Sequence, residues 1–427
     1  NLNFGAFSKA TELKKRIWFT LGALIVYRLC TYIPLPGIDT DAMRSIFEQA
    51  QGGVLGMFNV FSGGALERMS IIALNIMPYI SASIIVQLLT SMSPTFAQLK
   101  KEGEAGRKKL NQYTRYGTVV LTAAQAYALA RGLESWGGQN GVTAVIDPGL
   151  FFQASTVITL VGGTMFLMWL GEQITSRGVG NGISLIIMAG IVAELPRALA
   201  GTLELGSTGA LSTGLILGLF ILMIAVIVGI VYFERAQRRI LIQYPKRQEG
   251  NKMFQGNTSH MPLKLNTAGV IPPIFASSLL LMPATMAGFS AQAGGPEWLN
   301  TVNAYLGHGQ PLYMLLYAGL IIFFCFFYTA VVFNPEETAD NLKRYGGFIP
   351  GIRPGARTSE YLDFVLTRLT LVGSLYLVVI CLIPEFLTSR FAVPFYFGGT
   401  SLLIVVNVTM DTVGQVHGHL MAHQYEG

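Results

Sequence analysis

The sequence contains little charge for its length. Of its 427 residues, 12% are Asp, Glu, Lys or Arg, whereas 52% are hydrophobic. Soluble domains carry about 25% charged residues, so this composition argues against a water-soluble protein and for a membrane protein. A membrane-spanning helix needs about 20 mostly apolar residues, which leaves room for about ten spans in a chain of this length.

Patterns typical of disulfides, metal sites and catalysis are also missing. The three cysteines, Cys30, Cys325 and Cys381, stand singly in separate apolar stretches, so we expect buried free thiols. The sequence has no HExxH motif, no GxSxG motif and no paired aspartates within an apolar run. His419 and His423 lie four residues apart in what we interpret as a solvated tail. We therefore predict no enzyme, no metal site and no cofactor.

Ionisable side chains are rare inside the apolar runs. Arg28 lies toward the end of the first run, Asp411 lies toward the end of the last, and Glu172 follows the fourth. A coupled transporter or proton pump needs such groups near the bilayer midplane, where they are costly and are kept for function. A coupled solute transporter is therefore an alternative that the sequence disfavours.

Ten apolar runs separated by polar loops are candidate membrane spans. The first follows three basic residues but lacks a signal-peptide cleavage site, so we interpret it as a retained signal anchor. The third and fifth are short or diluted by polar residues, as re-entrant or interfacial segments often are. The runs are 17–33, 71–90, 118–130, 155–170, 183–195, 211–233, 267–288, 311–333, 365–383 and 393–413.

Lys and Arg are concentrated on one side of this arrangement. If the N-terminus is cytoplasmic, 23 of the 29 Lys and Arg residues fall in the inner segments. Inner loops carry this excess in membrane proteins, so both termini are predicted to be cytoplasmic. The inner loops 234–264 and 334–367 are longer and more basic than orientation requires. We predict docking surfaces there, with orientation or contact with anionic lipid as the alternative; the residues are Arg238, Arg239, Lys246, Arg247 and Arg353.

A glycine-rich segment, residues 51–70, lies between the first two runs and is too short to cross the membrane. We predict a half-helix that enters from the outer face. Irregular backbone at membrane depth is tolerated where it lines a cavity or is buried in protein, so the segment implies a cavity. The alternative is a helix lying flat on the outer interface.

Isoleucines recur four residues apart in the second and fifth runs, as Ile76 with Ile80 and Ile183 with Ile187. Each pair lies on one face of a helix. An aliphatic ring can seal a pathway by excluding water without binding a particular solute. A lipid-facing stripe is the commoner explanation of such pairs, and the pattern leaves both open.

Long motifs throughout the chain resemble the SecY family, the channel subunits of the bacterial Sec translocon. The resemblance covers essentially the whole length, with departures at Pro273 and Asn407 and a shorter C-terminal tail. The motifs are FNVFSGGALERMSI at 58–71, IMPYISASIIVQLLT at 76–90, KKEGEAGRKKLNQYTRYGT at 100–118, GTMFLMWLGEQIT at 163–175, AGVIPPIFASS at 268–278, FNPEETADNLKRYGGFIPGIRPG at 333–355 and PFYFGGTSLLIVV at 394–406.

The resemblance implies an all-α membrane protein with ten transmembrane helices in two inverted five-helix halves around an hourglass pore. The expected units are an interfacial segment 1–16, a first half 17–200, a second half 201–415 and a tail 416–427. The implied function is translocation of unfolded preproteins across the bacterial inner membrane and release of transmembrane segments into it. The implied partners are SecE, SecG, the motor ATPase SecA, the ribosome and signal-bearing preproteins. A membrane scaffold or insertase without a pore is a further alternative.

The resemblance also assigns site residues. The plug is expected at 54–68, the lateral gate between the second and seventh spans, with Gln87 and Asn266 as its polar pair, and Arg353 matches a key loop arginine of the family. The expected pore ring is Ile76, Ile80, Ile183, Ile187, Ile274 and Ile404, and the named plug residues are Phe58, Asn59, Phe61, Ser62, Gly63 and Gly64.

Overall fold

The protein is described by a computed structural model. It covers residues 11–49, 59, 62–135, 145–209, 212–245, 247–249, 252–254, 258–277, 279–280, 298, 301, 311–391 and 399–426. Phe58, Phe61 and Lys246, which the sequence analysis singled out, lie outside the described residues.

Five long helices make up the first half of the chain, in the order of the first five apolar runs. They are α2 (Thr11–Cys30), α5 (Met77–Met92), α7 (Glu104–Ser135), α8 (Leu150–Arg177) and α9 (Gly182–Ser207). Two shorter helices, α3 (Thr40–Gln49) and α6 (Pro94–Lys101), lie in the connections. The third and fifth runs lie within helices of 32 and 26 residues, so the more polar sequence beside each run continues the helix rather than ends it.

The second half is also built from long helices. They are α10 (Thr213–Arg235), α13 (Pro311–Val332), α15 (Ala356–Phe391) and α16 (Gly399–Glu426). Residues 271–277 are also helical, and the shorter α14 (Pro335–Arg344) follows α13. The boundary predicted at residue 200 lies inside α9, because that helix continues to Ser207. The chain connects the two halves through the short segment between α9 and α10.

Among the described residues, five helices are long and apolar enough to span a membrane: α8, α9, α10, α13 and α15. Helix α5 qualifies only together with α6, and the two are bent by 98°. The bend lies at Ser93, whose backbone is extended (ψ 129°), because Pro94 disfavours helical backbone in the residue before it. Helices α2 and α7 carry more charge in their terminal turns, which lowers their hydropathy without shortening them.

The second predicted span begins later than expected. The apolar run starts at Ile71, whereas α5 starts at Met77 and is preceded by turns. Asn75 has a φ of 52°, which an α-helix cannot accommodate. Pro78 lies in the first turn of α5, where its missing N–H has no helical partner to lose. Apolar character alone does not show where the helix starts.

The two basic loops are held together at one end of the bundle. Strand β1 (Gln237–Gln243) pairs antiparallel with β4 (Thr258–Lys264), and β2 (Arg247–Glu249) pairs with β3 (Lys252–Phe254). Gln243 and Phe348 donate backbone hydrogen bonds to each other, each 2.9 Å long. A small core of five buried side chains supports this contact: Ile240, Leu263, Ile349, Leu362 and Val365.

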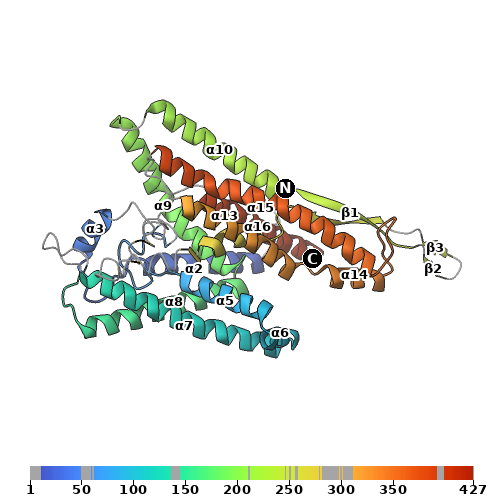
Figure 1. The fold of residues 1–427 in the computed structure, drawn as a ribbon, viewed down its shortest axis with the longest axis horizontal. Coiled ribbons are helices and arrows are strands. Elements are labelled where there is room, and N and C mark those ends of the chain that lie inside the picture. The colour runs from blue at the N-terminus through green and yellow to red at the C-terminus, as the bar shows by residue number, and fades with distance from the viewer. Residues whose placement is uncertain are drawn as a thin grey trace.

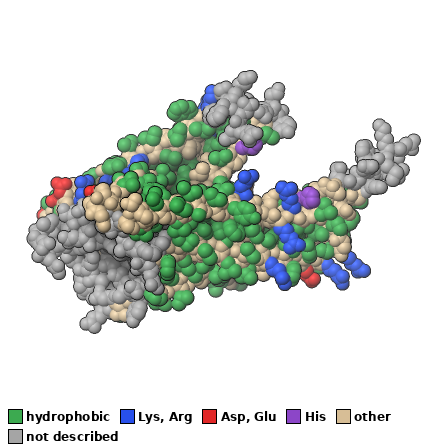
Figure 2. Space-filling model, turned by 90° about the horizontal axis from the view of Figure 1, so that it is seen from above, with side chains coloured by type: hydrophobic (Ala, Val, Ile, Leu, Met, Phe, Trp, Pro, Cys, Tyr) green, Lys and Arg blue, Asp and Glu red, His purple; other side chains and the backbone are tan. Residues whose placement is uncertain are grey.

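The long helices run roughly along one axis, with the strands and α14 at one end of the molecule and α3 at the other (Figure 1). We call these the hairpin end and the α3 end. Figure 2 shows hydrophobic side chains over the middle of one face and Lys and Arg toward the hairpin end. Helix α10 exposes Leu217, Ile221, Ile224 and Val228, a stripe that fits contact with lipid.

Helix α9 is the junction between the halves. It contacts α8 and α2 of the first half, and α10 and α16 of the second. One buried apolar cluster continues through this junction and includes residues from α2, α5, α8, α9, α10, α13, α15 and α16. The core of the molecule is therefore shared by both halves, and α9 contributes side chains to it.

Candidate functional site

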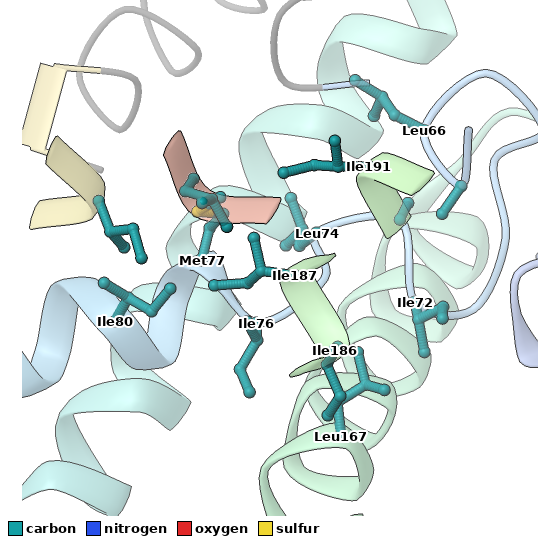
Figure 3. Packing of buried hydrophobic residues seen from close by; sticks show 14 of the residues in the cluster. Leu66, Ile72, Leu74, Ile76, Met77, Ile80, Leu167, Ile186, Ile187 and Ile191 are labelled. Carbon is teal, nitrogen blue, oxygen red and sulfur yellow. The ribbon is translucent and has the colours of Figure 1, made fainter. Parts of the chain in front are cut away.

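Five of the six isoleucines singled out by the sequence belong to the shared apolar cluster, and the sixth, Ile183, packs against it. Ile76 precedes α5, Ile80 is in α5, and Ile187 is in α9. In the second half, Ile274 is in the helical stretch 271–277 and Ile404 is in α16. Figure 3 shows Ile76, Ile80 and Ile187 in one group, with Leu66 and Ile191 nearby. Residues from both halves of the chain thus meet at this site.

Burial separates the two explanations that the sequence left open. Ile76 and Ile404 are 0% exposed, and Ile187, Ile80 and Ile274 are between 1% and 8% exposed. Ile183 is half-buried and packs against the same cluster. Five of the six side chains therefore do not form a lipid-facing stripe. Their role as a pore ring stays a prediction.

The described part of the glycine-rich segment is helical at Asn59 and forms turns from residue 62 onward, so the half-helix that we predicted does not include residues 62–70. Turns continue from 62 to 69 and from 71 to 76, and Ser70 pairs with Pro34 in an isolated β-bridge. The backbone of Gly63, Gly64, Met69 and Asn75 has positive φ, between 47° and 82°, which interrupts a regular helix. Glycine adopts this conformation readily, so the paired glycines explain part of the irregular path.

These turns are nevertheless buried, as irregular backbone at membrane depth must be. Ala65, Leu66 and Met69 are at most 2% exposed and belong to the same cluster as the isoleucines. Ile72 and Leu74 continue the segment into that cluster (Figure 3). A helix lying flat on an interface would expose one face, so this alternative does not describe residues 62–76.

No hydrogen bond joins the polar pair expected at the lateral gate, Gln87 and Asn266, within the described residues, and their role at a gate stays a prediction. The Asn266 Nδ2 atom donates to Glu234 Oε1 at 2.8 Å and to the Gly269 carbonyl oxygen at 3.1 Å. Within the described residues, the buried Gln87 Oε1 atom accepts no hydrogen bond. A carboxylate is the stronger acceptor for an amide N–H, which explains why Asn266 turns toward Glu234.

Glu234 is a functional candidate that the sequence analysis missed. It is the second-last residue of α10, and Tyr376 of α15 donates its O–H to the same Oε1 atom at 3.4 Å. The Tyr376 ring also stacks on Phe233, with centroids 4.7 Å apart. The carboxylate therefore joins α10, α15 and the segment that leads into residues 271–277. The sequence feature that could have identified Glu234 is its position directly after the apolar run 211–233.

The predicted docking arginines lie at the hairpin end. Arg238 and Arg239 are exposed on β1, and the backbone of Arg247 is in β2. Arg353 is exposed in a turn bounded by Gly351 and Gly355, whose φ angles are 82° and 104°. The Thr358 O–H donates to the Arg353 carbonyl oxygen at 2.8 Å and fixes the turn to the start of α15.

A family model named SecY matches residues 70–413. The chain belongs to the SecY family. The protein translocase subunit SecY of Escherichia coli K12 is 58% identical over 415 residues, which are 97% of this chain and 93% of that protein. The SecY subunit of Vibrio cholerae serotype O1 is 58% identical over 424 residues, 99% of this chain and 95% of that protein.

Solved structures of channels share the fold. A protein-conducting channel is matched with a TM-score of 0.65 at 18% identity, covering 95% of this chain and 92% of that chain. Sec61 from a canine ribosome–channel complex is matched with a TM-score of 0.63 at the same coverage. The ten-helix architecture around an hourglass pore, expected from the sequence, is consistent with this fold.

The Asn266 assignment can be tested by double-mutant cycles. Asn266→Leu removes two hydrogen bonds, one of them to a charged group, and is expected to lower the free energy of unfolding by about 1–3 kcal/mol. The coupling of this change with Glu234→Gln should exceed about 0.5 kcal/mol, and its coupling with Gln87→Leu should fall below that value. The measurement is unfolding of the purified protein in lipid nanodiscs. A coupling of Asn266 with Gln87 that exceeds its coupling with Glu234 would contradict the Asn266–Glu234 assignment and favour the Asn266–Gln87 pair.

Proposed function

We propose that this chain works as the gated protein-conducting pore of a translocase in the bacterial inner membrane. As a member of the SecY family, it is a protein translocase subunit with the fold of a protein-conducting channel. The observation that carries the proposal is the buried cluster in which isoleucines from both halves meet the turns of residues 62–76. Unfolded preproteins would pass between the halves at this point.

The bilayer explains why such a pore is needed. A charged residue at the bilayer centre costs roughly 2.5 to 3.5 kcal/mol, and each unpaired peptide group costs several more. An extended polypeptide crossing lipid directly would therefore meet a very large barrier. A path through protein removes this cost, and a collar of aliphatic side chains keeps water and ions out when no polypeptide is present.

The gate is proposed between α5, which carries the half-buried Gln87, and the helical residues 271–277, which follow the buried Asn266. Opening there would let an apolar segment of about 20 residues leave the pore sideways into lipid. Because Asn266 bonds to Glu234, movement of this helix requires exchange of that hydrogen bond. The hydrogen bond that restrains the Asn266 side of the gate is thus made to α10, in the second half of the chain, and not to Gln87 of α5.

The partners are proposed at the hairpin end, and its excess of Lys and Arg supports a cytoplasmic position for that end. The exposed arginines of the joined basic loops would receive the ribosome or the motor ATPase SecA, with anionic lipid headgroups nearby. SecE and SecG would complete the complex. We propose no catalytic role for this chain, since energy for transport would come from the bound partner.

The collar can be tested by polar substitution. Ile187→Asn or Ile274→Asn should wet the constriction, raise the resting ion conductance and let preproteins with defective signal sequences pass. The measurement is single-channel current in planar bilayers together with import into vesicles. Ile230→Asn is the matched control, because Ile230 is fully buried in the same cluster but lies outside the proposed ring. Equal conductance in the ring and control variants would contradict the collar.

The plug can be tested by deletion. Removal of residues 54–68 should raise the resting ion leak while translocation continues, because the proposed plug closes the path without forming its walls. Leak is measured as conductance of reconstituted channels without substrate. A leak equal to that of the intact chain would argue against a plug.

Arg353 can be tested by two substitutions that differ in what they preserve. Arg353→Glu should abolish motor-driven import at unchanged protein level, and Arg353→Lys should retain part of it because the charge remains but the planar fork of donors is lost. ATP-driven import into vesicles and SecA binding are measured in parallel. Arg357→Glu, a change at an exposed neighbour, is the control. Full import with Arg353→Glu would exclude the docking role.

A further inference from the structure

Glu67 is the most deeply buried member of the ion pairs in the described chain. It lies in the turns of the proposed plug, and its side chain is 4% exposed. Arg197 of α9 donates Nη1 to Glu67 Oε2 at 2.9 Å and Nη2 to Oε1 at 3.1 Å. This two-point geometry is the strong form of an arginine–carboxylate contact. The pair joins residues that are 130 positions apart in the sequence.

The backbone around Glu67 is built to hold the carboxylate in place. The Glu67 N–H donates to Asn59 Oδ1 at 3.0 Å, and the Ser62 hydroxyl donates to the Asn59 carbonyl oxygen at 3.0 Å. The Tyr27 O–H of α2 donates to the Ser62 carbonyl oxygen at 3.4 Å. Glu67 is therefore part of a small hydrogen-bonded unit that includes Asn59 and Ser62 and is bonded to α2.

Further charges surround this unit on the α2 side. Arg28 Nη1 donates to the Gly63 carbonyl oxygen, and Arg68 donates to the same oxygen at 3.0 Å. Arg68 Nε also donates to the Thr31 carbonyl oxygen at 3.1 Å. Glu194 of α9 lies 4.0 Å from Arg28 and 3.9 Å from Arg197. Arg28 and Arg68 thus donate to backbone carbonyl oxygens, whereas Arg197 donates to the buried Glu67 carboxylate.

The glycines allow the segment to approach α9 closely. A Cβ atom added to Gly64 would lie 2.6 Å from Glu194 Oε1, and one added to Gly63 would lie 2.9 Å from the Gly190 Cα atom. Both glycines also have positive φ, of 70° and 82°. The backbone of this segment therefore packs directly against α9 at Gly63 and Gly64, and the Glu67–Arg197 ion pair lies beside this contact.

We propose that the Glu67–Arg197 ion pair is a salt-sensitive latch that holds the plug segment on α9. The proposal rests on the plug assignment above and adds the contact that sets how readily the plug is released. The Arg197 side chain is 59% exposed, so it can move into water, whereas Glu67 cannot be left buried without a partner at low cost. Breaking the pair and displacing the segment are therefore one event.

The latch predicts a measurable change in plug exposure. Ala65 is 0% exposed, so a cysteine at this position, in a chain whose Cys30, Cys325 and Cys381 are replaced, reports displacement by its rate of reaction with a membrane-impermeant maleimide. Glu67→Gln is expected to raise this rate about tenfold in reconstituted full-length channels, the order expected for loss of a hydrogen bond to a charged group. Raising the salt concentration should speed labelling of the intact pair and leave Glu67→Gln nearly unchanged.

Three further variants isolate the pair from other effects. Arg197→Gln should match Glu67→Gln, and the double variant should label no faster than either one, because each change already removes the same contact. The exchange of charges, Glu67→Arg with Arg197→Glu, should slow labelling again relative to Glu67→Arg alone. Arg44→Gln removes one exposed positive charge near the same end of the molecule and should have no effect.

The outcomes separate the latch from the plug itself. Unchanged labelling in Glu67→Gln and Arg197→Gln overturns the latch, even if deletion of 54–68 raises the ion leak. Additive effects of the two changes overturn it as well, because the residues would then act independently. Faster labelling with unchanged ion conductance supports the latch and counts against the sealing role of the plug.

Discussion

The bilayer core offers no water to polar groups, and the arrangement of this chain follows from that constraint. Most of the chain forms helices, which satisfy their own backbone hydrogen bonds. Residues 62–76 depart from helical geometry, and they are buried in the shared apolar cluster. Two carboxylates follow the same constraint, since the buried Glu67 contacts Arg197 and the half-buried Glu234 accepts a hydrogen bond from Asn266. Irregular and charged elements thus lie where the plug segment contacts α9 and where α10 contacts α15.

Much of the fold could be predicted from the sequence, because hydrophobicity and helix length report directly on the bilayer. Every apolar run contains helical residues, although the sixth, seventh and tenth are described in part and the second begins with turns. The ends were predicted less well. Helix α5 starts after Asn75 because of backbone geometry, and α9 continues through Pro196 to Ser207, although the apolar run ends near Leu195. The apolar composition of a run predicts neither the later start of α5 nor the later end of α9.

The site was predictable where neighbours in sequence share a helical face. Ile76 with Ile80 and Ile183 with Ile187 were found by their spacing, whereas Ile274 and Ile404 needed the family resemblance. Long-range polar partners were not predictable in this way. Asn266 lies 32 residues from Glu234, and a polar side chain in a sequence does not show which of several partners it will meet. The hydrogen bond from Asn266 to Glu234, in place of one to Gln87, was not predicted for this reason.

The central claim is that a polypeptide passes through the isoleucine cluster between the two halves. The most direct measurement traps a preprotein in mid-transport, with a photoreactive residue placed at successive positions along it, and maps the cross-links by mass spectrometry. The account predicts that the residue at mid-membrane depth cross-links to Ile187 of α9 and Ile404 of α16. Cross-links at that depth to lipid, or to exposed positions such as Ile158 of α8, would contradict it.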